Sequence, residues 1–225
     1  MNALSNIKIT DIKTITPESD DSQPWDFTLN WMIGKYCNYV CTYCDKSNRD
    51  KSSPHHSLET LKQFWTNSKN AALDKRFTKI RVIITGGEPT SNPNLIEFLK
   101  YLHTEKDTLK YLSVNFLTNI SQSKEYYLEA IKYSSISFST HFEHWNEEEA
   151  LDIILACNKK GAVNVMLMLE EEYSNRVLAI EEILTKEGVS KTVQRIRNTY
   201  MAKPINNKEY KIFDYEKWKQ QNGKV

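Results

Sequence analysis

Residues 81–90 read RVIITGGEPT, and this segment contains most of a strand and the turn that follows it. Residues 82–84 are β-branched and fit the pleated surface of a strand, while the glycines and the proline behind them mark a turn. Asn92 then precedes Pro93, a pair that favours the first turn of a helix. The segment therefore predicts one strand followed by one helix.

The same alternation of strand and helix continues along most of the chain. Short β-branched or apolar runs occupy residues 27–33, 80–85, 111–118, 135–139, 162–169 and 192–196. We expect five helices between them, with Ser57, Asn92, Ser123, Asn146 and Ser174 at their starts and Gly161 and Gly188 behind the last two. These units predict an α/β fold with a mostly parallel sheet, either open and doubly wound or curled into an incomplete barrel.

The pattern indicates one core domain over residues 27–197. Residues 1–26 are polar with isolated isoleucines, and we expect them to form an N-terminal extension that can add an edge strand. Residues 198–225 are aromatic and basic, and we expect this tail to pack on the core. In either form of the sheet, functional residues are expected at the carboxyl ends of the strands.

Composition excludes several classes of protein. The 225 residues are 40% hydrophobic, enough to bury a real core. Thirty Lys and Arg against 29 Asp and Glu leave a net charge of +1, so no overall field attracts a nucleic acid or an anionic membrane. The longest apolar runs are far below the roughly 18 residues that span a bilayer, and no secretory signal is visible. We expect a cytoplasmic protein without a membrane or nucleic-acid partner.

Three cysteines, Cys37, Cys41 and Cys44, follow directly after the first predicted strand. Three thiolates on one tight loop can hold three irons of a cubane cluster and leave the fourth iron open for chemistry. A structural zinc site completed by His55 or His56 is one alternative, and three thiols without a ligand are another. Common zinc fingers use two cysteine pairs, whereas only one CxxC pair is present here.

Residues 37–44, CNYVCTYC, match the pattern CxxxCxφC in which φ is aromatic, and Tyr43 fills the aromatic place. Residues 86–89, GGEP, follow one strand-helix unit later. In both motifs the chain resembles the radical S-adenosylmethionine (SAM) superfamily. The resemblance implies a partial (βα)6 TIM-like barrel in which Cys37, Cys41 and Cys44 ligate a [4Fe-4S] cluster. It also implies that SAM chelates the fourth iron.

In that superfamily the reduced cluster passes one electron to SAM, and the resulting 5′-deoxyadenosyl radical removes a hydrogen atom from the substrate. The resemblance therefore implies a radical SAM enzyme with an electron donor such as flavodoxin or ferredoxin. The substrate, a small molecule or a peptide, is not indicated. Two subclasses fit a short chain with this loop: 7-carboxy-7-deazaguanine synthases and activating enzymes for glycyl radical enzymes. A non-catalytic zinc or iron-sulfur scaffold is the alternative from another class.

Further cofactor contacts follow from the resemblance. By itself, the turn of Gly86, Gly87, Glu88 and Pro89 is an ordinary strand-to-helix connection, in which glycines allow close approach and a carboxylate can accept from an ammonium group. The resemblance assigns this loop to the amino group of SAM, and it adds Tyr43 to the cofactor-binding residues.

The next two strand ends supply the remaining candidates. Thr118 and Asn119 resemble a TNG ending of part of the superfamily, although Ile120 replaces the glycine, and they are assigned to SAM. Ser139 shares a strand face with Ser137. Relatives often have a serine at this strand end, so the resemblance assigns Ser139 to the SAM carboxylate or ribose. His141 follows at the rim as a substrate-side candidate, and no catalytic residue is identified.

The fourth cysteine, Cys157, lies in the apolar segment ILACNKK and is expected to behave as a small buried hydrophobe. No cysteine follows it in the sequence. The cysteine-rich extension that carries auxiliary clusters in many peptide-modifying relatives is therefore not expected, and one cluster is the prediction.

Overall fold

The computed structural model describes residues 27–107, 109, 111–196 and 220. Six parallel strands form one sheet in the order β1-β2-β3-β4-β5-β6. Their bounds are β1 Phe27–Met32, β2 Lys79–Thr85, β3 Tyr111–Thr118, β4 Ser135–Thr140, β5 Val163–Leu169 and β6 Ser190–Arg195. The sequential order confirms the partial TIM-like fold, because a doubly wound sheet reverses its strand order at a switch point. The expected edge strand in residues 1–26 and the packing tail in 198–225 lie outside the described residues.

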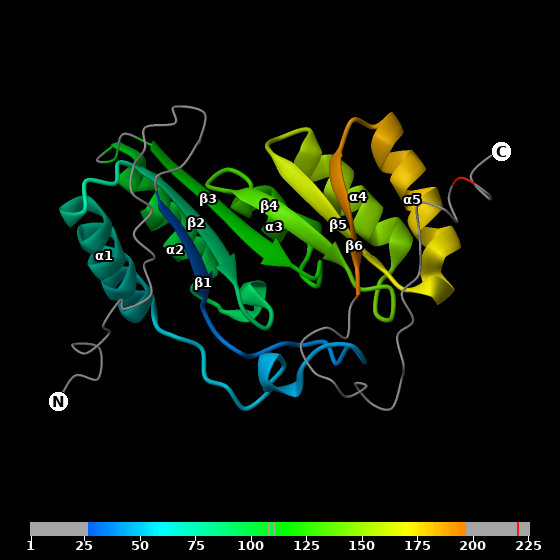
Figure 1. The fold of residues 1–225 in the computed structure, drawn as a ribbon, viewed down its shortest axis with the longest axis horizontal. Coiled ribbons are helices and arrows are strands. Elements are labelled where there is room, and N and C mark those ends of the chain that lie inside the picture. The colour runs from blue at the N-terminus through cyan, green and yellow to red at the C-terminus, as the bar shows by residue number, and fades with distance from the viewer. Residues whose placement is uncertain (1–26, 108, 110, 197–219, 221–225) are drawn as a thin grey trace.

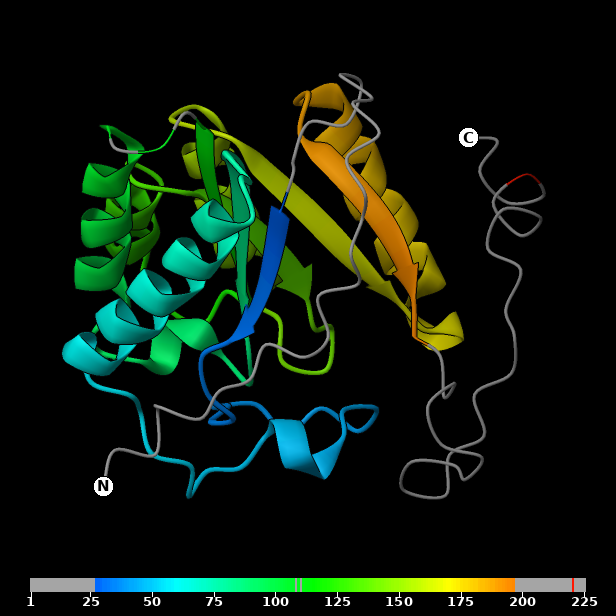
Figure 2. The same cartoon turned by 60° about the vertical axis from the view of Figure 1, so that its left-hand side comes forward.

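Five α-helices connect the strands, as predicted, and cover one face of the sheet (Figures 1 and 2). Their bounds are α1 Leu58–Asp74, α2 Leu95–Thr104, α3 Lys124–Ala130, α4 Glu147–Asn158 and α5 Ser174–Lys186. The side chains of Ser57, Ser123 and Asn146 cap α1, α3 and α4 by accepting backbone N–H bonds, as the sequence predicts. None of the described helices is long and apolar enough to cross a membrane.

Two of the expected helix starts are wrong. Pro93 disfavours helical geometry at the residue before it, so Asn92 is extended with ψ 117°, and α2 starts only at Leu95. The side chain of Asn92 instead accepts from the N–H of Asn94 at 2.9 Å. Ser174 is the first residue of α5 rather than its cap, because a 3₁₀ turn, Glu171–Tyr173, leads directly into the helix.

The core lies between the sheet and the helices. In β2 the buried residues Ile80, Val82 and Ile84 alternate with half-buried ones, as expected for a strand with one face under helices. Trp65 of α1 and Phe98 of α2 are fully buried against this face. The residues of β2 that alternate with its buried ones, such as Arg81, Ile83 and Thr85, are half-buried on the opposite face, which leads to the carboxyl-end rim where the candidate site residues lie.

Beyond the ends of β1 and β2 the two chain segments continue side by side. The N–H of Ile33 donates to Thr85 O at 2.9 Å, that of Gly87 donates to Gly34 O at 2.9 Å, and that of Glu88 donates to Tyr36 O at 2.7 Å. A Cβ atom at position 87 would lie 2.1 Å from Tyr36 O. Gly87 of the GGEP turn is therefore required, because the backbone of Tyr36, just before the first cysteine, lies too close for a side chain.

We expect Gly87→Ala to destabilise the fold because the new methyl group meets a fixed carbonyl oxygen. Overpacking of this kind costs about 1–3 kcal/mol, which urea denaturation of the purified variant would measure as a lower free energy of unfolding. Gly34→Ala is the matched control, since a Cβ atom there meets nothing within 4 Å. Equal stability of the two variants would contradict the close approach.

Candidate active site

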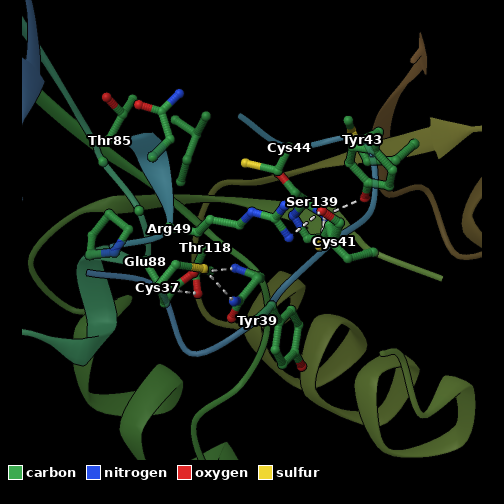
Figure 3. A pocket seen from close by; sticks show the side chains of 18 residues that line it. Cys37, Tyr39, Cys41, Tyr43, Cys44, Arg49, Thr85, Glu88, Thr118 and Ser139 are labelled. Carbon is green, nitrogen blue, oxygen red and sulfur yellow. Dashed lines mark hydrogen bonds between the residues drawn. The ribbon is translucent and has the colours of Figure 1, made fainter. Parts of the chain in front are cut away.

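A cavity opens at the carboxyl ends of β1 to β5 (Figure 3). Its empty space, including the open mouth, is about 850 Å³. All residues that the sequence assigned to the site line it: Cys37, Cys41, Tyr43, Cys44, Gly86, Gly87, Glu88, Pro89, Thr118, Asn119, Ser139 and His141. The lining also includes residues that the sequence did not single out: Tyr39, Asn48, Arg49, Thr85, Leu117 and Met168.

The three cysteines lie on a short turn, which we call the cysteine loop, residues 37–44. The N–H of Cys44 donates to Cys41 O at 3.2 Å, so the last two cysteines are drawn together by a backbone bond. Burial raises the pKa of all three thiols, that of Cys41 to about 12. The thiols influence one another's pKa electrostatically, as expected for groups that face a shared space. A bound metal would have to displace their protons.

The loop after β4 lies against the cysteine loop. Glu143 accepts from the N–H of Thr42 at 2.8 Å and also from the Thr42 hydroxyl. The ring Nδ1 of His141 lies 2.5 Å from the Tyr43 hydroxyl and 3.6 Å from the sulfur of Cys41. Burial lowers the pKa of His141 to about 4, so the neutral ring can accept from Tyr43. His141, which the sequence offered as a substrate-side candidate, thus has its partners in the cysteine loop.

The side chain of Glu88 connects the ends of β2 and β3. Its Oε1 accepts from the Thr90 N–H at 3.0 Å, the Thr90 hydroxyl at 2.6 Å and the Thr118 hydroxyl at 2.9 Å, while Oε2 accepts from the Asn119 N–H at 2.7 Å. Burial raises its pKa and the hydrogen bonds oppose that rise. In the described part of the chain no Lys, Arg or His forms an ion pair with it. A cationic ligand would offset this buried charge.

Asn119 presents an unused acceptor in the cavity wall. Its amide nitrogen donates to Asn38 Oδ1 at 2.9 Å and lies 3.9 Å from the sulfur of Cys37. Its Oδ1 is buried and has no partner among the described residues. A buried acceptor without a donor costs about 1–3 kcal/mol, so this atom is suited to receive an N–H or O–H from a ligand.

Ile120 follows Asn119 in a left-handed conformation, with φ 62°. This conformation favours glycine and is strained for a β-branched residue. The position is the one at which the resembling TNG pattern has its glycine. The isoleucine therefore keeps the turn of that pattern at a cost in backbone strain, and its side chain is buried, with 8% of its surface exposed.

The structure does not bring the expected zinc ligands His55 and His56 into the cavity that the three cysteines line. The His55 ring lies instead against Tyr36, with ring centroids 4.9 Å apart. Cys41, Glu143 and His144 offer ligand atoms within 4.8 Å of one another. That set includes only one thiol, and the Glu143 carboxylate in it already accepts hydrogen bonds from Thr42. Three thiols at one cavity fit an iron-sulfur cluster better.

Comparisons with known proteins give a family match and similar folds. The family model described as Radical SAM superfamily matches residues 31–199. SuiB of Streptococcus suis, solved bound to S-adenosylmethionine, has a similar structure, with a TM-score of 0.63, 15% identity and coverage of 83% of this chain and 44% of that one. The structure of anSMEcpe with bound AdoMet matches with a TM-score of 0.58 and 13% identity, covering 84% of this chain and 55% of that one.

The chain thus spans about half the length of these solved proteins, and at such identities the likeness shows the fold alone. No curated protein matches the sequence.

The Glu88 contacts generate a stability prediction. Glu88→Ala leaves the N–H groups of Thr90 and Asn119 without their acceptor, and each lost bond costs about 1 kcal/mol, so urea denaturation should show a loss of about 2–4 kcal/mol. Glu97→Ala on the exposed side of α2 is the control, since it removes only a surface pair with Lys100 and should change stability by less than about 0.5 kcal/mol. A loss no larger than that of the control would mean that the Glu88 bonds do not hold the two strand ends.

Proposed function

Because this chain belongs to the radical SAM superfamily, we propose that it is an enzyme that uses one [4Fe-4S] cluster to cleave SAM reductively and start hydrogen abstraction from a substrate. Membership implies an iron-sulfur cluster and SAM as cofactors, and enzymes of this superfamily generally need a reductant. One observation carries the proposal for this chain. In the part of the chain that the structure describes, three thiols line the same cavity as a buried carboxylate without an ion pair and an amide oxygen without a donor.

Cys37, Cys41 and Cys44 would hold three irons of the cluster and leave the fourth for SAM. Bound together, the two cofactors would supply radical chemistry, and the protein would supply orientation and exclusion of water. Burial of Cys41, with 5% of its surface exposed, supports the exclusion of water. The contacts of Glu143 and His141 hold the cysteine loop in place from the side of β4.

The cavity wall offers complementary groups for a zwitterionic, cationic cofactor. Glu88 keeps capacity for a further donor at Oε2, where only one hydrogen bond arrives, and its charge favours an ammonium group. Asn119 Oδ1 offers a second acceptor. Thr118 acts through Glu88, because its hydroxyl donates to that carboxylate and also contacts Tyr127. Tyr43, Ser139, Gly86, Gly87 and Pro89 complete the proposed cofactor wall.

The proposal includes a one-electron donor, flavodoxin or ferredoxin. A peptide or a small molecule as substrate, and the two narrower subclasses, stay predictions from the sequence. One similar structure, of anSMEcpe, was solved with AdoMet and a bound Cp18Cys peptide, at 14% identity, a TM-score of 0.59 and coverage of 54% of that chain. It supports testing peptides first.

Cys41→Ala should abolish cluster binding, because two remaining thiolates cannot hold a stable cubane. Anaerobic reconstitution with iron and sulfide, followed by iron and sulfide analysis, would measure this. Cys157→Ala is the matched control: Cys157 is fully buried in α4 among apolar residues and does not line the cavity. Wild-type iron content in Cys41→Ala, or loss of iron in Cys157→Ala, would overturn the ligand assignment.

The reaction is tested by reducing the reconstituted protein, adding SAM and measuring 5′-deoxyadenosine by chromatography. We expect production by the wild type and by Cys157→Ala, and none by Cys41→Ala. A change in the EPR spectrum of the reduced cluster when SAM is added would show coordination separately from turnover. A loaded [4Fe-4S] cluster with neither a spectral change nor product would contradict the proposed function and favour a scaffold.

A further inference from the structure

Among the described residues that line the cavity, Arg49 is the only Lys or Arg. Its Nη1 donates to the carbonyl oxygen of Cys41 at 2.9 Å. Figure 3 shows its side chain lying among the three labelled cysteines. The guanidinium forms no ion pair with a carboxylate in the part of the chain that the structure describes. One of its N–H groups is used by the backbone of the cysteine loop.

A negative charge faces the same loop from the opposite element. One carboxylate oxygen of Glu143 lies within 4.8 Å of the Cys41 sulfur, and its side chain is only 14% exposed. Two opposite charges therefore face the cysteine loop from different segments, Arg49 at the Cys41 carbonyl oxygen and Glu143 near the Cys41 sulfur.

We propose that the positive charge of Arg49 and the negative charge of Glu143 together set the reduction potential of the iron-sulfur cluster held by the cysteine loop. The two charges act in opposite directions. This inference rests on the proposed function. Three thiolates and a [4Fe-4S]²⁺ core carry a net charge of −1, and uptake of one electron from an external reductant makes it −2. A nearby cation favours that step and a nearby anion opposes it. Net charge and hydrogen bonding around the sulfurs are the established means by which proteins tune such potentials.

A second use of Arg49 would be to bind the carboxylate of SAM. The two uses differ in one measurable respect. A role in the potential acts on the cluster alone, whereas a carboxylate contact acts only after SAM has bound. The midpoint potential is therefore measured without SAM, and SAM affinity is measured separately on the same samples.

The test is an anaerobic redox titration of the reconstituted wild type and of Arg49→Gln, Arg49→Lys and Glu143→Gln, followed by EPR of the reduced cluster. Loss of the cation in Arg49→Gln should lower the midpoint potential. We expect a change of about tenfold in the equilibrium constant of reduction, or about 59 mV for a one-electron couple. Arg49→Lys should return the potential towards that of the wild type. Glu143→Gln should raise it, because the amide keeps an oxygen for Thr42 without the charge.

Iron and sulfide content of each variant is the structural control. If Arg49→Gln takes up no cluster, Arg49→Lys and Glu143→Gln still carry the test. Arg49→Lys keeps the positive charge and should keep the wild-type potential, whereas Glu143→Gln removes a negative charge and should raise the potential. Equal potentials in fully loaded variants would overturn the inference and leave the proposed function intact. Weaker SAM binding by Arg49→Gln at an unchanged potential would likewise overturn it in favour of the carboxylate contact. A wild type that takes up no cluster would instead contradict the proposed function itself.

Discussion

Two backbone hydrogen bonds beyond the ends of β1 and β2 hold the candidate site together. They join Gly87 to Gly34 and Glu88 to Tyr36, and they exist because position 87 has no Cβ atom to collide with the Tyr36 carbonyl. The cysteine loop begins directly after this contact. Its position over the carboxyl edge of the sheet therefore follows from a steric requirement of the backbone, and the glycines of the GGEP turn serve the protein's own chain as well as any ligand.

The site contains energetically unfavourable groups, and the stability of the rest of the fold tolerates them. Glu88 is a buried carboxylate with no ion-pair partner among the described residues, Asn119 Oδ1 is a buried acceptor without a donor there, and Ile120 has a left-handed backbone. Such groups gather where a fold is built to receive a ligand, since the ligand supplies the missing charge and donors. The complete helix layer and the fully buried side chains behind β2 and β3 provide the stability that tolerates them.

Positive and negative side chains lie at different places around the cavity. Glu88 on one wall and Glu143 behind the cysteine loop are negative, and Arg49 is the positive group of the lining. Glu88 accepts from groups that follow β2 and β3, and Glu143 follows β4 and accepts from the cysteine loop. The guanidinium lies with the thiols that would become anionic on binding iron (Figure 3). Among the described residues, Glu88 and Arg49 thus bring charges of both signs to the lining of one cavity.

The sequence alone determined the six strands, the five helices and the residues of the two motifs, because strand alternation, helix caps and cysteine spacing are local signals. It placed Thr118, Asn119 and Ser139 at one rim, since parallel strands end at the same edge. It could not place Arg49 or Glu143 against the cysteines, although Arg49 follows Cys44 by only five residues and Glu143 follows His141 by two. The path of a loop and the direction of its side chains depend on contacts with distant segments, such as Thr42 with Glu143. Likewise, only the tertiary structure showed that Glu88 is committed to the end of β3, because its partners come from a strand some thirty residues away.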